Sequence, residues 1–355
     1  MEIRLINPYA PKDNEYKGQI HFHTTESDGI NTPTEMVTAY RDAGYDFVSI
    51  ADHDMITADP GVAGILFIPG NEQTTAAPEH IVATNTSINT PNGDTQTLLD
   101  AWRLEGSVAF LAHLDYPGLE FTDEALLTYQ RHYAIDISGG EDEWDVLLTN
   151  HLRCFGSYGD DSHGSGGATF DTKWIKVFAD SLTVDDIMDA LKTGNYYSSA
   201  GPDMAVSVSG NVITVTTPIA GWIAFIGKDG DTLQLKIGVT TSSYTVQGDE
   251  IYVRARIVVG GKKAWSNPVY ISPYGVGDYS DDIPAATTGA KSFGRTERQD
   301  EIWGDINAIR GIVDTGLLGP EEAEYAGDYL ELLTLYWDKF IAEYDAIHEA
   351  ERTFG

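Results

Sequence analysis

Six of the nine histidines lie where a short apolar run meets a loop, most of them within two residues of an acid. They are His21, His23, His53, His80, His113 and His163. The apolar runs are typical of buried strands, and α/β sheets and barrels build their sites at the edge where parallel strands end. Neutral imidazole is a common ligand of zinc, iron and manganese, and carboxylates can bridge two such ions. The pattern therefore predicts a hydrolytic centre that holds several metal ions.

Acidic side chains accompany these histidines. His21 and His23 are two positions apart on a predicted strand, so their side chains face the same side and can bind one ion together. Asp28 follows in a Ser-Asp-Gly turn, and Glu72 ends an apolar run, where an acid is costly unless it is paired or bound to a cation. Asp161 lies in a later acidic loop. Considered singly, such residues are more often core histidines and turn acids; six strand-end histidines together favour a metal centre.

The neighbours of His53 allow two interpretations. Asp52 and Asp54 flank its imidazole, and a carboxylate that orients a ligand histidine is common around metal sites. Alternatively, one of the two acids caps the next loop. The remaining histidines are expected to have no role, because they lie in predicted helices or in the acidic tail: His132, His151 and His348.

Composition limits the classes of partner. The formal net charge is −33, with 22 Lys and Arg against 55 Asp and Glu, so we expect neither nucleic acid nor an anionic membrane surface as a partner. The single cysteine, Cys154, excludes an intrachain disulfide and a thiolate zinc site. Residues 1–17 lack the apolar stretch of a secretory signal, and no run approaches the ~18 apolar residues of a membrane span. A soluble, cytoplasmic protein is expected.

Residues 17–200 alternate strand-like and helix-like segments, a rhythm that predicts a mainly parallel sheet or barrel. Thr32, Pro33 and Glu35 form a helix start with a capping box, and Gly44 stops that helix. Strands are expected at 17–23, 45–52, 64–69, 80–84, 108–113, 134–138, 153–158 and 173–177, and helices at 33–43, 95–104, 123–132, 141–152 and 183–192.

After Gly201-Pro202 the pattern changes to short alternating strands separated by turn signals such as Ser209-Gly210-Asn211. This change predicts a small antiparallel β-sandwich over residues 203–274. Residues 275–300 are rich in Gly, Ser, Thr and Asp and are expected to form a flexible loop. Residues 301–355 are expected to form a helical tail, which offers a surface for self-association or assembly. The sandwich strands are expected at 204–208, 212–216, 222–226, 232–239, 244–246 and 251–259.

The order of the motifs resembles the PHP family, the polymerase and histidinol phosphatase domain, over roughly residues 17–200. The order is His-x-His, Ser-Asp-Gly, Asp-His, Gly-x-Glu and three later histidine sites that end in Asp-x-His. The resemblance implies a distorted (β/α)7 barrel over residues 1–202, with up to three metal ions at the C-terminal ends of its strands. It implies a first ion on His21, His23, Glu72 and Asp161, a second on Glu72, His80 and His113, and a third on Asp28, His53 and His163.

Three later segments resemble the branch of that family named after the CehA and McbA metallohydrolases, which appends a β module to the barrel. They are Tyr196–Ser199 with Gly201-Pro202, Tyr252–Arg256, and Ala264–Pro268. That branch includes enzymes for ester or carbamate cleavage. The resemblance therefore leaves the substrate class open between phosphoesters and other esters.

The favoured interpretation is a metal-dependent phosphoesterase acting on a small phosphomonoester or phosphodiester. Two or three divalent ions (Zn, Mn or Fe) would hold a bridging hydroxide that attacks phosphorus. Glu72 would bridge the ions, and His53 or His163 would protonate the leaving oxygen. The nearest basic residues in sequence are Arg153, Lys173 and Lys176, too few to favour a dianionic substrate. The alternatives are a metal-dependent carboxylic or carbamic ester hydrolase and a non-catalytic structural or assembly protein.

Overall fold

The computed structural model describes residues 4–77, 79–114, 121–129 and 132–272. The expected flexible loop at 275–300 and helical tail at 301–355 lie outside these residues. Apart from residues 230–232, the described residues all belong to one compact unit. No helix in these described stretches combines the length and the hydropathy needed to cross a membrane.

A twelve-stranded mixed sheet runs in the order β1-β17-β15-β16-β11-β10-β2-β3-β4, with β12, β13 and β14 attached through β15. The pairs β2–β3 and β3–β4 are parallel, whereas β10 is antiparallel to both β2 and β11. The strands are β1 (Arg4–Ile6), β2 (Asn14–Gln19), β3 (Phe47–Ser49), β4 (Leu66–Ile68), β10 (Trp174–Ala179), β11 (Tyr196–Ser199), β12 (Ala205–Ser209), β13 (Val212–Ile226), β14 (Thr232–Thr245), β15 (Tyr252–Val259), β16 (Lys262–Ser266) and β17 (Val269–Ser272).

A second sheet of five strands runs in the order β5-β6-β7-β8-β9. Here β6 is antiparallel to β5 and β7, while β7, β8 and β9 are parallel. The start of β6 therefore lies at the same edge as the ends of the other strands. The strands are β5 (Gly70–Thr74), β6 (His80–Thr84), β7 (Val108–Leu111), β8 (Ala134–Asp136) and β9 (Phe155–Ser157).

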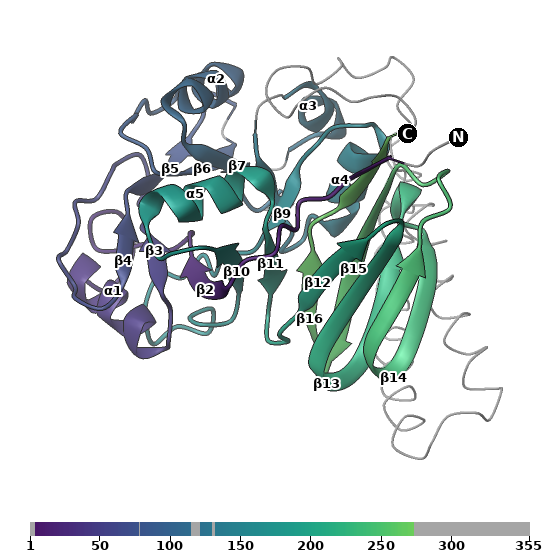
Figure 1. The fold of residues 1–355 in the computed structure, drawn as a ribbon. Coiled ribbons are helices and arrows are strands. Elements are labelled where there is room, and N and C mark those ends of the chain that lie inside the picture. The colour runs from purple at the N-terminus through teal and green to yellow at the C-terminus, as the bar shows by residue number, and fades with distance from the viewer. Residues whose placement is uncertain (1–3, 78, 115–120, 130–131, 273–355) are drawn as a thin grey trace, which may run out of the picture. The chain divides into compact units, whose positions relative to one another are not determined.

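The helices begin where the sequence predicts. Thr32 and Glu35 form the expected capping box on α1, and Thr183 accepts from the Asp186 amide at the start of α5. Helix α5 packs on β10 and β7 (Figure 1). Helix α3 is shorter than expected, because Tyr129 has an extended backbone, so His132 is not helical. The bounds are α1 (Pro33–Asp42), α2 (Thr95–Glu105), α3 (Asp123–Thr128), α4 (Glu141–Thr149) and α5 (Val184–Thr193), with a 3-10 turn at Lys228–Gly230.

The architecture is mixed α/β, but the closed (β/α)7 barrel and the mainly parallel sheet expected from the sequence are not found among the described strands. The chain passes from β4 in one sheet to β5 in the other at Pro69, which has no N–H to donate to a ladder. The far edge of β9 is also closed off. Gly156 donates its N–H to the Asn267 side chain, and its carbonyl accepts from Ser198. Side chains thus take the hydrogen bonds that a closing strand would use.

The pairs β12–β13, β13–β15, β15–β16 and β15–β17 are antiparallel, but all six strands from β12 to β17 belong to the twelve-stranded sheet and not to a separate sandwich as expected. Two of the strands in this β module are also longer than predicted. The predicted strands at 212–216 and 222–226 belong to one strand, β13, and those at 232–239 and 244–246 belong to β14 (Figure 1). Strand β16 pairs with β11 through Ser198 and Trp265, so strands on both sides of residue 202 share a sheet. The domain limits at 1–202 and 203–274 stay predictions.

Candidate metal centre

All nine of the residues expected to bind metal converge at one place. His21 and His23 follow β2, His53 follows β3, and His113 follows β7. Glu72 lies within β5, and His80 is the first residue of β6. Asp28 lies in the loop after β2, and Asp161 and His163 lie in the loop after β9. The turn of the chain at each strand end brings these side chains to the shared edge of the two sheets.

Backbone hydrogen bonds join the two sheets at this edge. Phe22 forms an isolated parallel bridge with Ser162, and His53 forms one with Glu72. The amide of Asp161 donates to the carbonyl of His21 (3.0 Å). Asp161 (φ 50°) and His113 (φ 29°) both have left-handed backbones, which cost energy outside glycine. Strain retained at two candidate ligands is typical of a site that the surrounding structure holds in place.

Glu72 is the centre of the cluster and is fully buried. Its Oε1 lies 3.1 Å from His80 Nδ1 and 2.9 Å from His113 Nε2. Its Oε2 lies 3.2–3.3 Å from a nitrogen of three further imidazoles, those of His21, His23 and His53. Burial alone would raise the pKa of Glu72, but the surrounding histidines hold it well below its usual range. The residue is therefore a buried carboxylate placed between two groups of imidazoles.

Asp161 completes a second group. Its Oδ1 lies 3.0 Å from His23 Nε2 and 3.4 Å from His21 Nε2. Burial opposes ionisation of Asp161, yet the histidine charges lower its pKa. Burial lowers the pKa of His23, but the hydrogen bond to Asp161 and the negative charge of Glu72 outweigh burial and raise the pKa to about 10. A metal ion bound at His23 would thus displace a proton.

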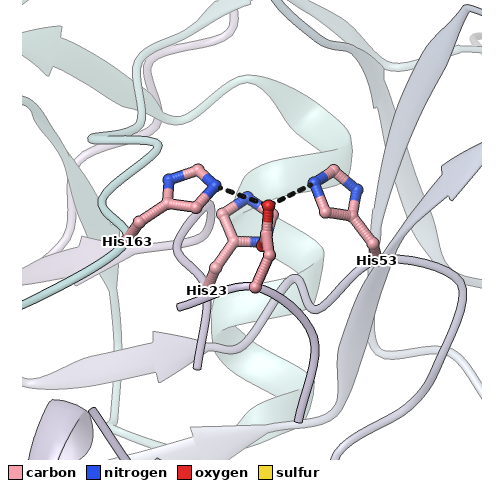
Figure 2. A group of neighbouring side chains, drawn as sticks. His23, His53 and His163 are labelled. Atoms are coloured by element: carbon pink, nitrogen blue, oxygen red, sulfur yellow. Dashed lines mark hydrogen bonds and ion pairs between the residues drawn. The ribbon is translucent and has the colours of Figure 1, made fainter. Parts of the chain in front are cut away.

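The third group is the most exposed. Asp28 Oδ2 lies 3.2 Å from His163 Nε2 and 3.7 Å from His53 Nε2, and Asp28 Oδ1 lies 3.8 Å from His23 Nδ1. Figure 2 shows the rings of His23, His53 and His163 arranged around one point. The side chains of Asp28 and His163 are 53% and 42% exposed, so a substrate can approach from this side.

The structure brings the candidate ligands together in three groups that differ from the expected sets in two ways, and metal binding by these residues stays a prediction. The first set is reproduced as His21, His23, Glu72 and Asp161, whose ligand atoms all lie within 4.8 Å of one another. The second grouping holds His53 with Glu72 and His80, and His113 contacts the same Glu72 oxygen as His80. The third adds His23 to Asp28, His53 and His163. His23 and His53 therefore each belong to two of these three ligand groups.

The donor set fits divalent metal ions better than a hydrogen-bonded network. Glu72 Oε2, both ring nitrogens of His21 and Nδ1 of His23 are buried and make no hydrogen bond. Such atoms are costly to bury unless something else satisfies them. Imidazole nitrogens and carboxylate oxygens in this proportion suit zinc, manganese or iron. A cation in the group of His21 and Glu72 would satisfy His21 Nε2 and Glu72 Oε2, and a cation near Asp28 would satisfy His23 Nδ1.

Gln19 and Asp160 position the ligand loops, and the sequence analysis assigned them no role. Gln19 Oε1 accepts from the amides of His21 and Asp160. Asp160 accepts from the amides of Asp171 and Lys173 and from the Tyr40 hydroxyl. Both side chains are buried. The sequence gives only weak signals for these roles, namely the acidic run at 160–161 and Gln19 itself. The type of a polar residue does not show that it will be buried next to a ligand.

Two roles were considered for Asp52, to order a loop or to orient the His53 ring. Its hydrogen bonds fit the first. Its Oδ1 accepts from the Thr24 amide (2.7 Å) and the Ser27 hydroxyl (2.8 Å). Its Oδ2 accepts from the hydroxyls of Thr24 (2.7 Å) and Thr57 (2.5 Å). This buried carboxylate therefore fixes the loop between His23 and Asp28.

We expect Asp52→Asn to weaken the exposed ligand group. An amide has only one acceptor oxygen, so at least one pair of these hydrogen bonds is lost and Asp28 is no longer held in place. The expected result is a loss of one bound ion per chain and a fall of about 10–100-fold in metal affinity, as for other residues that orient ligands. Elemental analysis after dialysis measures both. Asp94→Asn, which alters only the N-cap of α2, is the matched control; an equal loss in both variants would contradict the role of Asp52.

The three basic residues considered from the sequence lie in different surroundings. Lys176 is paired with Asp203 (2.7 Å) and Glu15 (3.6 Å). The guanidinium of Arg153 lies 5.6 Å from the centre of the Tyr270 ring. The Lys173 ammonium donates to Ser138 Oγ at 3.0 Å. The partner of Lys173, Ser138, therefore lies just beyond the end of β8.

The sequence matches no protein-family model and no curated protein. Its fold is similar to a two-domain protein from Bacteroides vulgatus ATCC 8482 that contains a predicted PHP-like metal-dependent phosphoesterase, with 18% identity, a TM-score of 0.45, and coverage of 76% of this chain and 98% of that one. It is also similar to the lesion-specific endonuclease PfuEndoQ from Pyrococcus furiosus (14%, TM-score 0.41, 50% and 56%) and to an amidohydrolase from Chromobacterium violaceum (18%, TM-score 0.31, 42% and 88%).

The first of these structures names the family that the order of the motifs resembles. The branch named after CehA and McbA stays a prediction. The chain spans about half the length of the endonuclease. The expectation that nucleic acid is not a partner stays a prediction.

Proposed function

We propose that this chain is a metal-dependent hydrolase that cleaves phosphoesters. The observation that carries the proposal is the buried Glu72 carboxylate, whose two oxygens lie within 3.3 Å of five imidazole nitrogens. The imidazoles around each Glu72 oxygen would supply donors for divalent ions, with Glu72 as a shared ligand. The group around Asp28 has the donors for a third.

Each part of the centre has a distinct task in this proposal. Bound divalent ions supply an activated water and neutralise charge on the ester oxygens. Glu72 fixes the separation of two ligand groups, and the buried His21 keeps bulk water from the inner group. His163 and His53 lie on the side that is open to solvent. If the group around Asp28 holds no third ion, either ring could pass a proton to a leaving oxygen, because neither is fully buried.

A second function is a metal-dependent carboxylic or carbamic ester hydrolase. It is favoured by the exposed carboxylate of Asp28, which lies where a substrate would arrive and repels a dianion. The same repulsion favours a phosphodiester or another monoanion over a phosphomonoester. A non-catalytic scaffold would have no need for nine convergent ligand side chains, two of them on strained backbones.

A substrate panel tests the proposal. We expect the full chain, loaded with zinc or manganese, to hydrolyse bis-p-nitrophenyl phosphate and p-nitrophenyl phosphate faster than p-nitrophenyl acetate. A chelator should abolish the activity, and added metal should restore it. Cleavage of the acetate alone would move the assignment to carboxylic esters. Metal-loaded protein without activity on any of the three would favour the scaffold. Hydrolysis of single-stranded and duplex DNA by the metal-loaded full chain should be measured in the same panel.

A further inference from the structure

A lysine without an acidic partner lies at the edge of the sheets that carries the ligands. Cations in this acidic chain commonly have such partners, as Lys12 has in Asp180 and Lys17 in Asp171. Among the described residues, no carboxylate oxygen lies within 4.0 Å of Lys173 Nζ. Its contacts are the Ser138 hydroxyl at 3.0 Å and the face of the Tyr158 ring, whose centre is 5.3 Å away. The positive charge of Lys173 is therefore not neutralised by a neighbour.

The partners of Lys173 connect it to the candidate ligands. Ser138 follows β8 by two residues, and Tyr158 directly follows β9. Asp136 Oδ1 accepts from the Ser138 amide (2.8 Å), while Asp136 Oδ2 accepts from the His113 amide (3.3 Å). The ammonium thus lies beside two strand ends at the same edge as His113.

The backbone of Lys173 is held firmly. Its amide donates to Asp160 Oδ1 (2.7 Å), and its carbonyl accepts from Gln19 Nε2 (2.8 Å). Asp160 makes further hydrogen bonds to backbone amides and to Tyr40, so its carboxylate is directed to the backbone and not to the ammonium. Asp160 and Gln19 are the residues that also position the loop of Asp161. The same buried groups therefore fix Lys173 and the metal ligands relative to each other.

We propose that Lys173 binds an anionic group of the substrate and thereby selects charged esters over neutral ones. This inference rests on the proposed hydrolase function. An ammonium is a compact point charge with three donors, so it can exchange the neutral Ser138 hydroxyl for a phosphoryl or carboxylate oxygen at little cost. In a chain with a formal net charge of −33, one uncompensated cation beside the centre has a large influence on the local potential.

The test compares Lys173→Gln with Lys176→Gln, a matched change at the nearby lysine that is paired with Asp203. In Lys173→Gln we expect KM for p-nitrophenyl phosphate, and the inhibition constant of inorganic phosphate, to rise about tenfold, because one charge-assisted hydrogen bond is lost. The value of kcat should change little, and Lys173→Arg should restore part of the affinity. Hydrolysis of p-nitrophenyl acetate and metal content should not change. Lys176→Gln should behave as wild type.

Two outcomes overturn this inference while leaving the hydrolase proposal intact. One is an unchanged KM for p-nitrophenyl phosphate in Lys173→Gln, and the other is an equal loss with the neutral acetate, which would indicate a structural role. If the wild-type chain cleaves none of the substrates, the proposed function fails instead. Calorimetric titration of metal-loaded protein with inorganic phosphate then still tests Lys173, since equal affinity in wild type and variant would refute it.

Discussion

Glu72→Gln should lower the rate of ester hydrolysis about a thousand-fold or more. This corresponds to a loss of about 4 kcal/mol of transition-state stabilisation. One oxygen of the Glu72 carboxylate contacts His23 and the other contacts His80, so Glu72 joins the two groups of imidazoles. An amide of the same shape carries no charge and presents an N–H₂ donor where a ligand oxygen should be. The hydrogens of the amide would then face the imidazole nitrogens on one side of Glu72, and the side chain could not serve as a ligand on that side.

The measurement has two parts, metal content after loading and dialysis, and the rate of ester hydrolysis. We expect at least one ion per chain to be lost together with the activity. Glu250→Gln is the control, because Glu250 is also buried and hydrogen-bonded, to Tyr244 and to two backbone amides, but lies in the β module. A Glu72→Gln protein with its full metal content and the wild-type rate would refute the bridging role.

The convergence of the candidate ligands could be predicted from the sequence because its signals are local. A histidine or acid at the end of an apolar run reports both its chemical type and its place at a strand end. Helix starts are local for the same reason, and the capping box of Thr32 and Glu35 forms as expected. These features need no knowledge of what lies across the sheet.

Sheet closure and the sharing of His23 and His53 between ligand groups could not be predicted, because they depend on residues far apart in the chain. The edge of β9 is closed by Asn267, which is 111 positions from Gly156. Pro218 and Gly221 suggest a break, yet β13 continues through both. The choice between His53 and His113 for one ligand group is decided by the turns after β3 and β7. Asp52 beside His53 is consistent with orienting the ring or fixing a loop, and only the fold distinguishes these roles.

A buried ion cluster, away from the candidate metal centre, links the β module to α4. Arg254 is 1% exposed and forms hydrogen bonds with both oxygens of Asp145 (2.9 and 2.5 Å) and with Glu141 (2.9 Å). Tyr252 also donates to Asp145 (2.6 Å). Burial raises the pKa of Asp145 in spite of the guanidinium. Burial also opposes ionisation of Glu141, but the charges of Arg256 and Arg254 lower its pKa.

Arg254→Met should therefore lower the free energy of unfolding by about 3–5 kcal/mol, because it leaves the buried Asp145 carboxylate without its main partner. Urea denaturation of the full chain measures the loss. Arg256→Met is the comparison two residues along β15: it removes a 3.1 Å hydrogen bond with Glu141, and about 1 kcal/mol should be lost.

The double variant Arg254→Met with Asp145→Leu separates the two explanations for such a loss. If the cost comes from the uncompensated charge, replacing that charge by an apolar side chain should recover at least half of the stability, since buried ion pairs are often replaced by apolar residues with little loss. If the cost comes from lost packing of Arg254, whose guanidinium lies 5.0 Å from the centre of the Trp144 ring, the double variant should be no more stable than the single one. Wild-type stability in the single variant would show that the cluster does not hold β15 on α4. The hydrogen bond between Gly156 and Asn267 would then remain as a contact between the β module and β9, whose following loop carries Asp161 and His163.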